Sequence, residues 1–242
     1  MQLNNWLKNN QWFNFDAFLS QLFKQHCLLC NASTNSQISL CKQCIDALPF
    51  APHPCCPQCG LPTQGETCGK CLKEKPYYDK TTALFAYAFP FDAVLQEYKY
   101  NHALYLSKTI AQLFIDHILS HNIDVIIPMP LHPNRLKERG FNQSAEVAYI
   151  LAKAIGIPVS DTVCQRIKNT PPQASLPLKA RLKNMRGAFS VNRELAAQHI
   201  KGKRIAIIDD VITTGSTVNE LSLVLKKAGA LSVHCYAFAR AT

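Results

Sequence analysis

The chain has 242 residues, 48% of them hydrophobic, which is enough for one domain of ordinary size with a small extra module and excludes wholesale disorder. It contains no apolar run of about 18 residues and no signal-peptide pattern, so we expect a cytoplasmic protein without a membrane-spanning helix. The formal net charge is +10, and ten of the eleven charged residues from 166 to 204 are Lys or Arg. This concentration favours a phosphorylated or polyanionic ligand over a loop whose charge only aids solubility.

Residues 1–26 are predicted to form an amphipathic segment, because apolar residues recur at helical spacing from Phe15 to Phe23. One role for such a helix is peripheral attachment to a membrane, with Trp6 and Trp12 at the interface. Packing against the chain's own domain is the alternative. We favour packing, because the segment carries little positive charge to attract anionic lipid.

Residues 27–76 contain four C-x-x-C pairs, and this spacing lets both thiolates of a tight turn face one tetrahedral ion. The pairs are Cys27 and Cys30, Cys41 and Cys44, Cys56 and Cys59, and Cys68 and Cys71. We predict a double zinc-ribbon module with two structural zinc ions, each bound by two neighbouring pairs. A single ion, interleaved pairs and a disulfide framework are the alternatives, and Cys55 is a spare that would replace Cys56 as a ligand.

Residues 77–242 alternate between strand-like and helix-like patterns. Strands are predicted at 81–89, 123–130, 188–191, 203–209 and 231–239, and helices at 141–156 and 217–229. Such alternation indicates an α/β domain with a mostly parallel sheet flanked by helices. Ligands of such sheets bind at the carboxyl ends of the strands, where Asp209 and Asp210 are expected.

The stretch that follows these two aspartates consists of small hydroxyl residues around one glycine and leads into the helix predicted at 217–229. Its members are Thr213, Thr214, Gly215, Ser216 and Thr217. Their N–H and hydroxyl groups can surround a phosphate at the helix N-terminus, and a glycine allows the backbone a close approach. Two carboxylates repel phosphate alone, so the ligand must also bring hydroxyl donors or Mg²⁺. A phosphorylated ribose meets both demands.

IAIIDDVITTGST (205–217) resembles the phosphoribosyl pyrophosphate (PRPP) signature of type I phosphoribosyltransferases. PMPLHPNRLKERGFNQ (128–143) and the basic stretch 166–189 resemble blocks of the ComF/GntX family, the competence protein F group of phosphoribosyltransferase-like proteins. The cysteine pairs before the domain match that family's layout. The resemblance covers roughly residues 27–242 and implies a type I phosphoribosyltransferase-like fold behind N-terminal zinc ribbons.

The resemblance also implies roles for individual residues. Asp209 and Asp210 would bind the ribose 2′ and 3′ hydroxyls, and residues 213–217 the 5′-phosphate. A pyrophosphate loop, with Mg²⁺ bridging to the sugar, would contain Leu131, His132, Arg135, Arg139 and Gly140. A flexible basic loop that closes over the site, or that binds DNA phosphates, would contain Arg166, Gln173, Arg181, Asn184 and Arg186.

Three functions fit this reading. The first, implied by the resemblance, is a factor of natural transformation that handles internalised single-stranded DNA at the cytoplasmic side of the membrane, with competence-machinery proteins as partners. The second is an enzyme that transfers 5-phosphoribose from PRPP to an unidentified base or acceptor. The third is a PRPP-sensing regulator without turnover.

Whether the chain catalyses turnover stays open at this point. Acid–base candidates by residue type are His102, His132 and His199, of which His132 is the best, with a capping or exposed role as the alternative for each. Three further residues, Tyr98, Tyr100 and Tyr105, would either stack on bases of single-stranded DNA or pack in the core.

Overall fold

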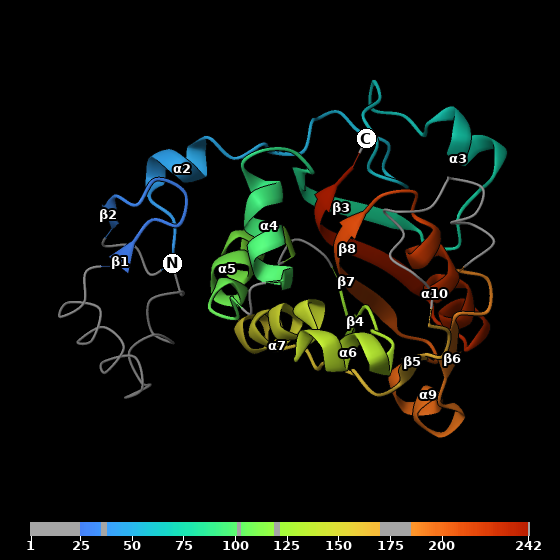
Figure 1. Cartoon of the computed structure of the whole chain (residues 1–242). Coiled ribbons are helices and arrows are strands. Elements are labelled where there is room, and N and C mark those ends of the chain that lie inside the picture. The colour runs from blue at the N-terminus through green and yellow to red at the C-terminus, as the bar shows by residue number, and fades with distance from the viewer. Residues whose placement is uncertain (1–24, 35–37, 101–102, 119–121, 170–184, 242) are drawn as a thin grey trace, which may run out of the picture. The chain divides into compact units, whose positions relative to one another are not determined.

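The structure is a computed structural model, shown in Figure 1. It describes residues 25–34, 38–100, 103–118, 122–169 and 185–241. Most of the predicted amphipathic segment therefore lies outside the described residues, as do His102, Gln173, Arg181 and Asn184. Within the described part of the chain, none of the helices has the length and apolar character needed to cross a membrane.

The chain forms two compact units, residues 1–47 and residues 48–242. In the first unit, the antiparallel strands β1 (Gln25–His26) and β2 (Ser33–Thr34) precede the short helix α2 (Lys42–Asp46). The second unit holds the remaining cysteine pairs and everything that follows them. The predicted division at residues 26 and 76 follows sequence motifs and stays a prediction.

The second unit begins with a cysteine-rich turn and α3 (Gly69–Lys73) and continues as an α/β domain. Its strands are β3 (Lys80–Ala86), β4 (Val125–Pro128), β5 (Cys164–Arg166), β6 (Phe189–Val191), β7 (Arg204–Ile212) and β8 (Ser232–Arg240). Its longer helices are α4 (Phe91–Tyr100), α5 (Leu106–Ile118), α7 (Gln143–Ile155) and α10 (Ser216–Lys227), with α6 (Pro133–Arg139) and α9 (Arg193–His199) shorter.

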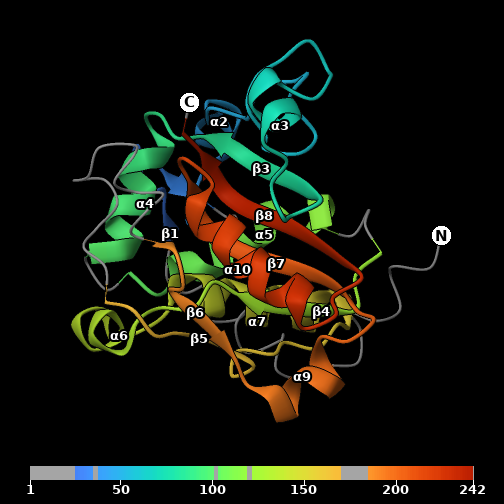
Figure 2. The ribbon, with the colours of Figure 1, turned by 90° about the vertical axis from the view of Figure 1, so that its right-hand side faces the viewer.

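Four of these strands form a sheet in the order β3-β8-β7-β4, and every pairing in it is parallel. Helices α5 and α7 cover one face and α10 covers the other, as Figure 2 shows with α10 in front of the strands. Both faces of the central strands are therefore buried, which explains the continuous apolar run from Ile205 to Ile208. The predicted α/β class with a parallel sheet between helices is confirmed.

Two predicted strands differ in detail. The segment predicted at 188–191 pairs as β6 with β5 in a separate antiparallel ribbon and is not part of the main sheet. The strand predicted to end at Asp209 continues to Ile212, because Asp209 pairs with Ala237 and Ile212 with Arg240 of β8. Pairing with β8 thus overrides the low strand propensity of the two aspartates.

Candidate functional site

A cavity of about 300 Å³ opens at the edge of the sheet where β4 and β7 end. It brings together many of the residues predicted for ligand binding: Asp209, Asp210, Thr213, Thr217, Leu131, His132, Arg135, Arg139 and Arg166. These residues come from three separate sequence blocks, and the parallel sheet places the ends of β4 and β7 beside each other. This is the position at which α/β sheets bind their ligands.

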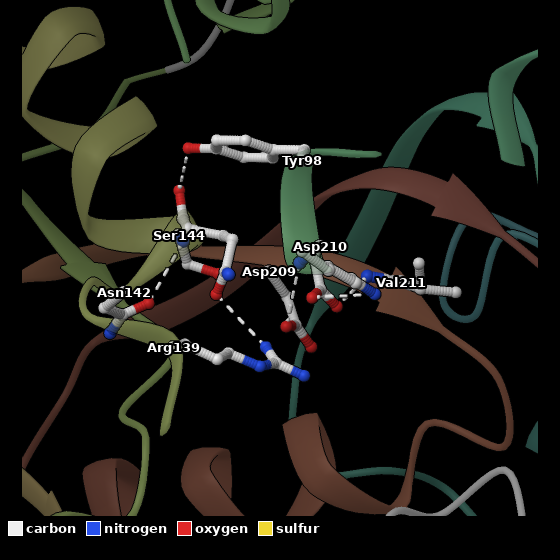
Figure 3. A network of polar contacts seen from close by, with 9 residues as sticks. Tyr98, Arg139, Asn142, Ser144, Asp209, Asp210 and Val211 are labelled. Carbon is white, nitrogen blue, oxygen red and sulfur yellow. Dashed lines mark hydrogen bonds and ion pairs between the residues drawn. The ribbon is translucent and has the colours of Figure 1, made fainter. Parts of the chain in front are cut away.

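Two carboxylates from β7 lie side by side in this cavity (Figure 3). The Asp210 N–H donates to Asp209 Oδ1 over 2.9 Å, and the Val211 N–H donates to Asp210 Oδ1 over 2.5 Å. Burial, followed by the neighbouring Asp210 carboxylate, raises the pKa of Asp209 to about 7. Hydroxyl donors or a cation in the cavity would therefore stabilise the charged form of the two carboxylates.

Cationic side chains face these carboxylates from three other elements. Lys99 of α4 forms an ion pair with Asp210, with Nζ and Oδ2 2.9 Å apart. Arg139 donates to Gln143 Oε1 over 3.1 Å, and its guanidinium lies 5.7 Å from the centroid of the Tyr100 ring. Arg166 is partly withdrawn from water, and this burial lowers its pKa. The cavity thus presents carboxylates on one side and cations on the other, which suits a ligand with both hydroxyls and phosphates.

The loop 213–217, which we call the phosphate loop, precedes α10 and has two different sides. Thr213 and Thr217 line the 300 Å³ cavity. The intervening residues 214–216 line a second cavity of about 170 Å³, which is also lined by Cys59, Cys71 and residues 74–78. Gly215 has a φ of 78° and is the N-cap of α10, so the backbone turns sharply there.

Two predicted residues of the pyrophosphate loop have local structural roles. His132 is the N-cap of α6, and its Nδ1 accepts the Asn134 N–H over 3.2 Å. Gly140 ends the same helix with a φ of 79° and does not line the cavity. The capping alternative for His132 is therefore the observed one, and among the residues that the structure describes its hydrogen bond is to the Asn134 N–H.

The predicted basic loop is only partly described. Arg166 lines the cavity, whereas Arg186 does not. The carbonyl of Arg186 accepts a hydrogen bond from Lys168 Nζ over 2.5 Å. Of the basic-loop residues that the structure describes, only Arg166 lines the cavity that contains Asp209 and Asp210.

Lys99 and Gln143 are among the residues of the cavity wall that sequence reasoning did not single out. Gln143 is 1% exposed; its Oε1 accepts from Arg139 and its carbonyl accepts from the Tyr98 hydroxyl over 3.0 Å. Its Nε2 has no hydrogen-bond partner among the described residues. The cavity wall therefore contains a buried donor that an acceptor group of a ligand can satisfy. Tyr98 is fully buried, which makes it a core residue and excludes it from base stacking.

The eight cysteines of the C-x-x-C pairs form two compact groups of sulfur atoms, each within 4.8 Å. The groups are Cys27, Cys30, Cys41 and Cys44, and Cys56, Cys59, Cys68 and Cys71. The structure thus groups neighbouring pairs and does not interleave them. Cys55 stays outside, with its thiol 3.9 Å from His53 Nδ1, and none of the chain's cysteines forms a disulfide.

The second cluster shows that these thiols fit a metal ion. Burial acts to raise the pKa of the Cys56 thiol. Hydrogen bonds from backbone N–H groups, that of Cys68 first, have the larger combined effect and lower this pKa from 9.0 to about 7. The Cys68 N–H lies 3.3 Å from Cys56 Sγ. Four sulfurs within reach of one another, supported by N–H donors, are what a structural tetrahedral zinc site requires.

Comparison with known proteins agrees with both parts of this description. A double zinc ribbon domain model matches residues 18–72, and a phosphoribosyl transferase domain model matches residues 142–242. Competence protein F of Haemophilus influenzae is 31% identical over 92% of this chain and 100% of its own length. The chain belongs to the competence protein F family.

Other members of this family are more distant. The DNA utilization protein YhgH of Salmonella typhimurium is 30% identical over 88% of this chain and 89% of its own length. Competence protein ComFC of Streptococcus pneumoniae is 25% identical over 85% of this chain and 90% of its own length. In this competence protein F family member, the type I phosphoribosyltransferase fold thus follows a double zinc ribbon that supplies two sites for structural zinc.

Proposed function

We propose that this competence protein F family member binds PRPP with Mg²⁺ and handles internalised single-stranded DNA at the cytoplasmic face of the membrane, alongside other competence-machinery proteins. The observation that carries the proposal is the cavity in which Asp209 and Asp210 face four cationic side chains. A ligand with neighbouring hydroxyls and several phosphates satisfies both sets of charges at once.

Each part of PRPP has a matching group in this site. Asp209 and Asp210 would accept hydrogen bonds from the ribose hydroxyls, and the phosphate loop would donate to the 5′-phosphate. Arg135 and Arg139 would contact the pyrophosphate, because guanidinium groups engage phosphate oxygens bidentately. Mg²⁺ prefers carboxylate and phosphate oxygens, so the donor set fits an ion that arrives with the ligand and neutralises part of its charge. Lys99 would release Asp210 when the ligand arrives.

The DNA part of the proposal rests on the names of the relatives and on the rim of the cavity. Competence protein F and the DNA utilization protein YhgH are both named for roles with DNA. Tyr87 and Tyr100 line the cavity and are exposed, and Arg139 lies over the Tyr100 ring. Aromatic rings beside cations are the usual means by which proteins bind single strands without reading sequence.

PRPP binding is tested by calorimetry in the presence of Mg²⁺. Wild-type protein should bind PRPP, and the double variant Asp209→Asn/Asp210→Asn should lose at least about a hundredfold in affinity, since two hydrogen-bonded carboxylates disappear. Asp161→Asn is the matched control, because Asp161 accepts from Tyr149 and does not line the cavity. Undiminished affinity in the double variant would overturn the assignment.

DNA binding is tested by fluorescence anisotropy with a labelled oligothymidine at several salt concentrations. Tyr100→Ala should weaken binding by about tenfold, and log affinity should fall steeply with log salt. The control is Tyr149→Ala, because Tyr149 is an exposed tyrosine of a different helix, α7, and does not line the cavity; this change should leave affinity unchanged. Salt-insensitive binding, or equal loss in both variants, would contradict the proposal.

An enzyme is the alternative, and one observation favours it. Gln143 Nε2, which has no hydrogen-bond partner in the described part of the chain, and the exposed ring of Tyr100 line one cavity, as the walls of a site for a planar acceptor would. Pyrophosphate release from PRPP across a panel of free bases distinguishes the two functions. Release that requires one base identifies a phosphoribosyltransferase, whereas PRPP binding without release identifies a binding domain.

A further inference from the structure

The second cysteine cluster lies directly behind the phosphate loop. Cys59 and Cys71 line the 170 Å³ cavity together with residues 214–216. A Cβ atom added to Gly215 would lie 2.9 Å from the Tyr78 hydroxyl oxygen, so the loop is closely backed by the chain that follows the cluster. The Asn219 side chain, one turn into α10, accepts the Tyr77 N–H over 2.7 Å.

Arg240, at the end of β8, connects the cluster to the loop. It is 4% exposed. Its Nε donates to the carbonyl of Cys59 over 2.9 Å, and its Nη1 donates to the carbonyls of Ile212, over 2.9 Å, and Thr213. One guanidinium therefore holds the backbone of a predicted zinc ligand and the first peptides of the phosphate loop at the same time.

The bonds from Arg240 also set the direction of the loop's N–H groups. In a trans peptide the C=O and the N–H of the next residue point in opposite directions. Holding the carbonyls of Ile212 and Thr213 toward Arg240 therefore turns the N–H groups of Thr213 and Thr214 away from it. These are donors that the proposed function assigns to the 5′-phosphate.

The charge of Arg240 gives the metal a part in this arrangement. A buried guanidinium requires a compensating charge, and none of the ion pairs found in the described residues involves Arg240. Four thiolates around one Zn²⁺ carry a net charge of about −2. Loaded with metal, the second cluster would therefore supply negative charge beside Arg240, whose Nε already donates to the Cys59 carbonyl.

We propose that the second zinc ribbon positions the phosphate loop for ligand binding. Arg240 is the positioning residue that links the ribbon to the loop. Metal in the second cluster then sets the affinity for a phosphorylated ligand, and metal in the first cluster does not. This inference rests on the proposed function for the identity of the ligand, but the link between cluster and loop exists without it.

The two clusters provide a matched pair for the test. Cys71→Ser and Cys41→Ser each remove one thiol from one cluster, and zinc content is measured for both. In Cys71→Ser we expect PRPP to bind about tenfold more weakly and the amides of 213–217 to exchange faster with deuterium. Cys41→Ser should match wild type in both readouts. Equal affinity and equal exchange in Cys71→Ser and wild type would overturn the inference.

A substitution that keeps the charge but breaks the link separates positioning from simple stability. In Arg240→Lys, a single ammonium group can reach the loop carbonyls but loses the second anchor at Cys59. Adding Cys71→Ser to Arg240→Lys should then weaken PRPP binding by less than about twofold, because coupled residues are non-additive. A residue with only a structural role would give independent, additive effects, and that result would contradict the inference. Arg204→Lys, remote from the loop and paired with Asp124, is the control.

The experiment also distinguishes failure of the two proposals. If wild-type protein does not bind PRPP, the proposed function fails. Hydrogen exchange at 213–217 then still decides the link, since it needs no ligand.

Discussion

The two cysteine clusters have the same ligands and similar spacing but different surroundings. The first belongs to the compact unit of residues 1–47, and the second to the unit that contains the whole α/β domain. In the second, backbone groups beside the cysteines bond to the domain: Arg240 donates to the Cys59 carbonyl, and the Thr81 N–H donates to the Pro57 carbonyl over 3.1 Å. The comparison teaches that one motif can belong to a separate compact unit or can line a cavity of the main domain.

The largest effect that sharpens this comparison is metal loss. Cys71→Ser should lower the free energy of unfolding of the α/β domain by about 5 kcal/mol, because a structural metal contributes directly to folding. Cys41→Ser should leave the main unfolding transition in place. Circular dichroism against denaturant, with zinc content measured on each protein, checks both. A loss of the main transition in both variants would erase the distinction between the clusters.

Arg240→Met is expected to have the next largest effect. It removes the donor shared by the Cys59, Ile212 and Thr213 carbonyls, and we expect the free energy of unfolding to fall by about 4 kcal/mol. The control is Arg204→Met, since the Arg204 side chain is partly exposed and forms an ion pair with Asp124, away from the cysteine clusters and the phosphate loop. Thermal unfolding of both variants at equal zinc content checks this, and equal shifts would contradict it.

A substitution of Asp209 tests the side of the phosphate loop that faces the 300 Å³ cavity, through the titration of one carboxyl group. The folded state raises the pKa of Asp209 from 3.8 to about 7, so it binds the proton more tightly than the unfolded chain does. Stability from this group is therefore present at low pH and is lost as the pH rises toward 7. Asp209→Asn should abolish that loss and stabilise the protein by about 4 kcal/mol at pH 8.

Urea unfolding from pH 5 to 8, with wild type beside Asp209→Asn, measures this pH dependence. The stabilisation should grow with pH and level off above pH 7. A stability difference between the two proteins that stays constant over this pH range would show that burial does not raise the pKa of Asp209. Zinc content should be the same in both proteins, because the substitution lies on the side of the loop away from the cluster.

The smallest predicted effect concerns the packing between the loop and the ribbon. Gly215→Ala places a methyl group 2.9 Å from the Tyr78 hydroxyl oxygen at a φ of 78°, and should cost about 2 kcal/mol. In a Tyr78→Phe background the cost should fall to about 1 kcal/mol, the part due to φ alone. Gly156→Ala, with a φ of 71° and no atom within 4 Å of its added Cβ, isolates that part. An unchanged cost in the Phe background would refute the contact.

The sequence predicts the parts of this site that depend on local pattern. The apolar run before Asp209 predicts a buried strand, and the hydroxyl loop after it predicts a helix N-terminus. The C-x-x-C spacing predicts the metal clusters and leaves interleaving to be excluded by the structure. Each of these signals lies within about a dozen residues of chain.

Long-range partners could not be predicted. Lys99 lies on α4, which carries no motif, and its ion pair with Asp210 spans more than a hundred residues of sequence. Arg240 reads as an ordinary polar residue after a strand, and its bond to Cys59 crosses 181 residues. Pairing of β6 with β5, and the order of strands in the sheet, likewise depend on packing that no single segment specifies.

The order of strands bears on how the chain is synthesised. Strand β3 lies at the edge of the sheet, and β8 is its partner there, with the Val233 N–H bonded to Asp79 154 residues earlier. A nascent chain on the ribosome can fill both cysteine clusters early, yet β3 has no sheet partner until β8 has emerged. Arg240 is the last residue of β8 and emerges with its end. A chain cut short before β8 would therefore contain both cysteine clusters, but neither the complete sheet nor the bonds by which Arg240 anchors the phosphate loop.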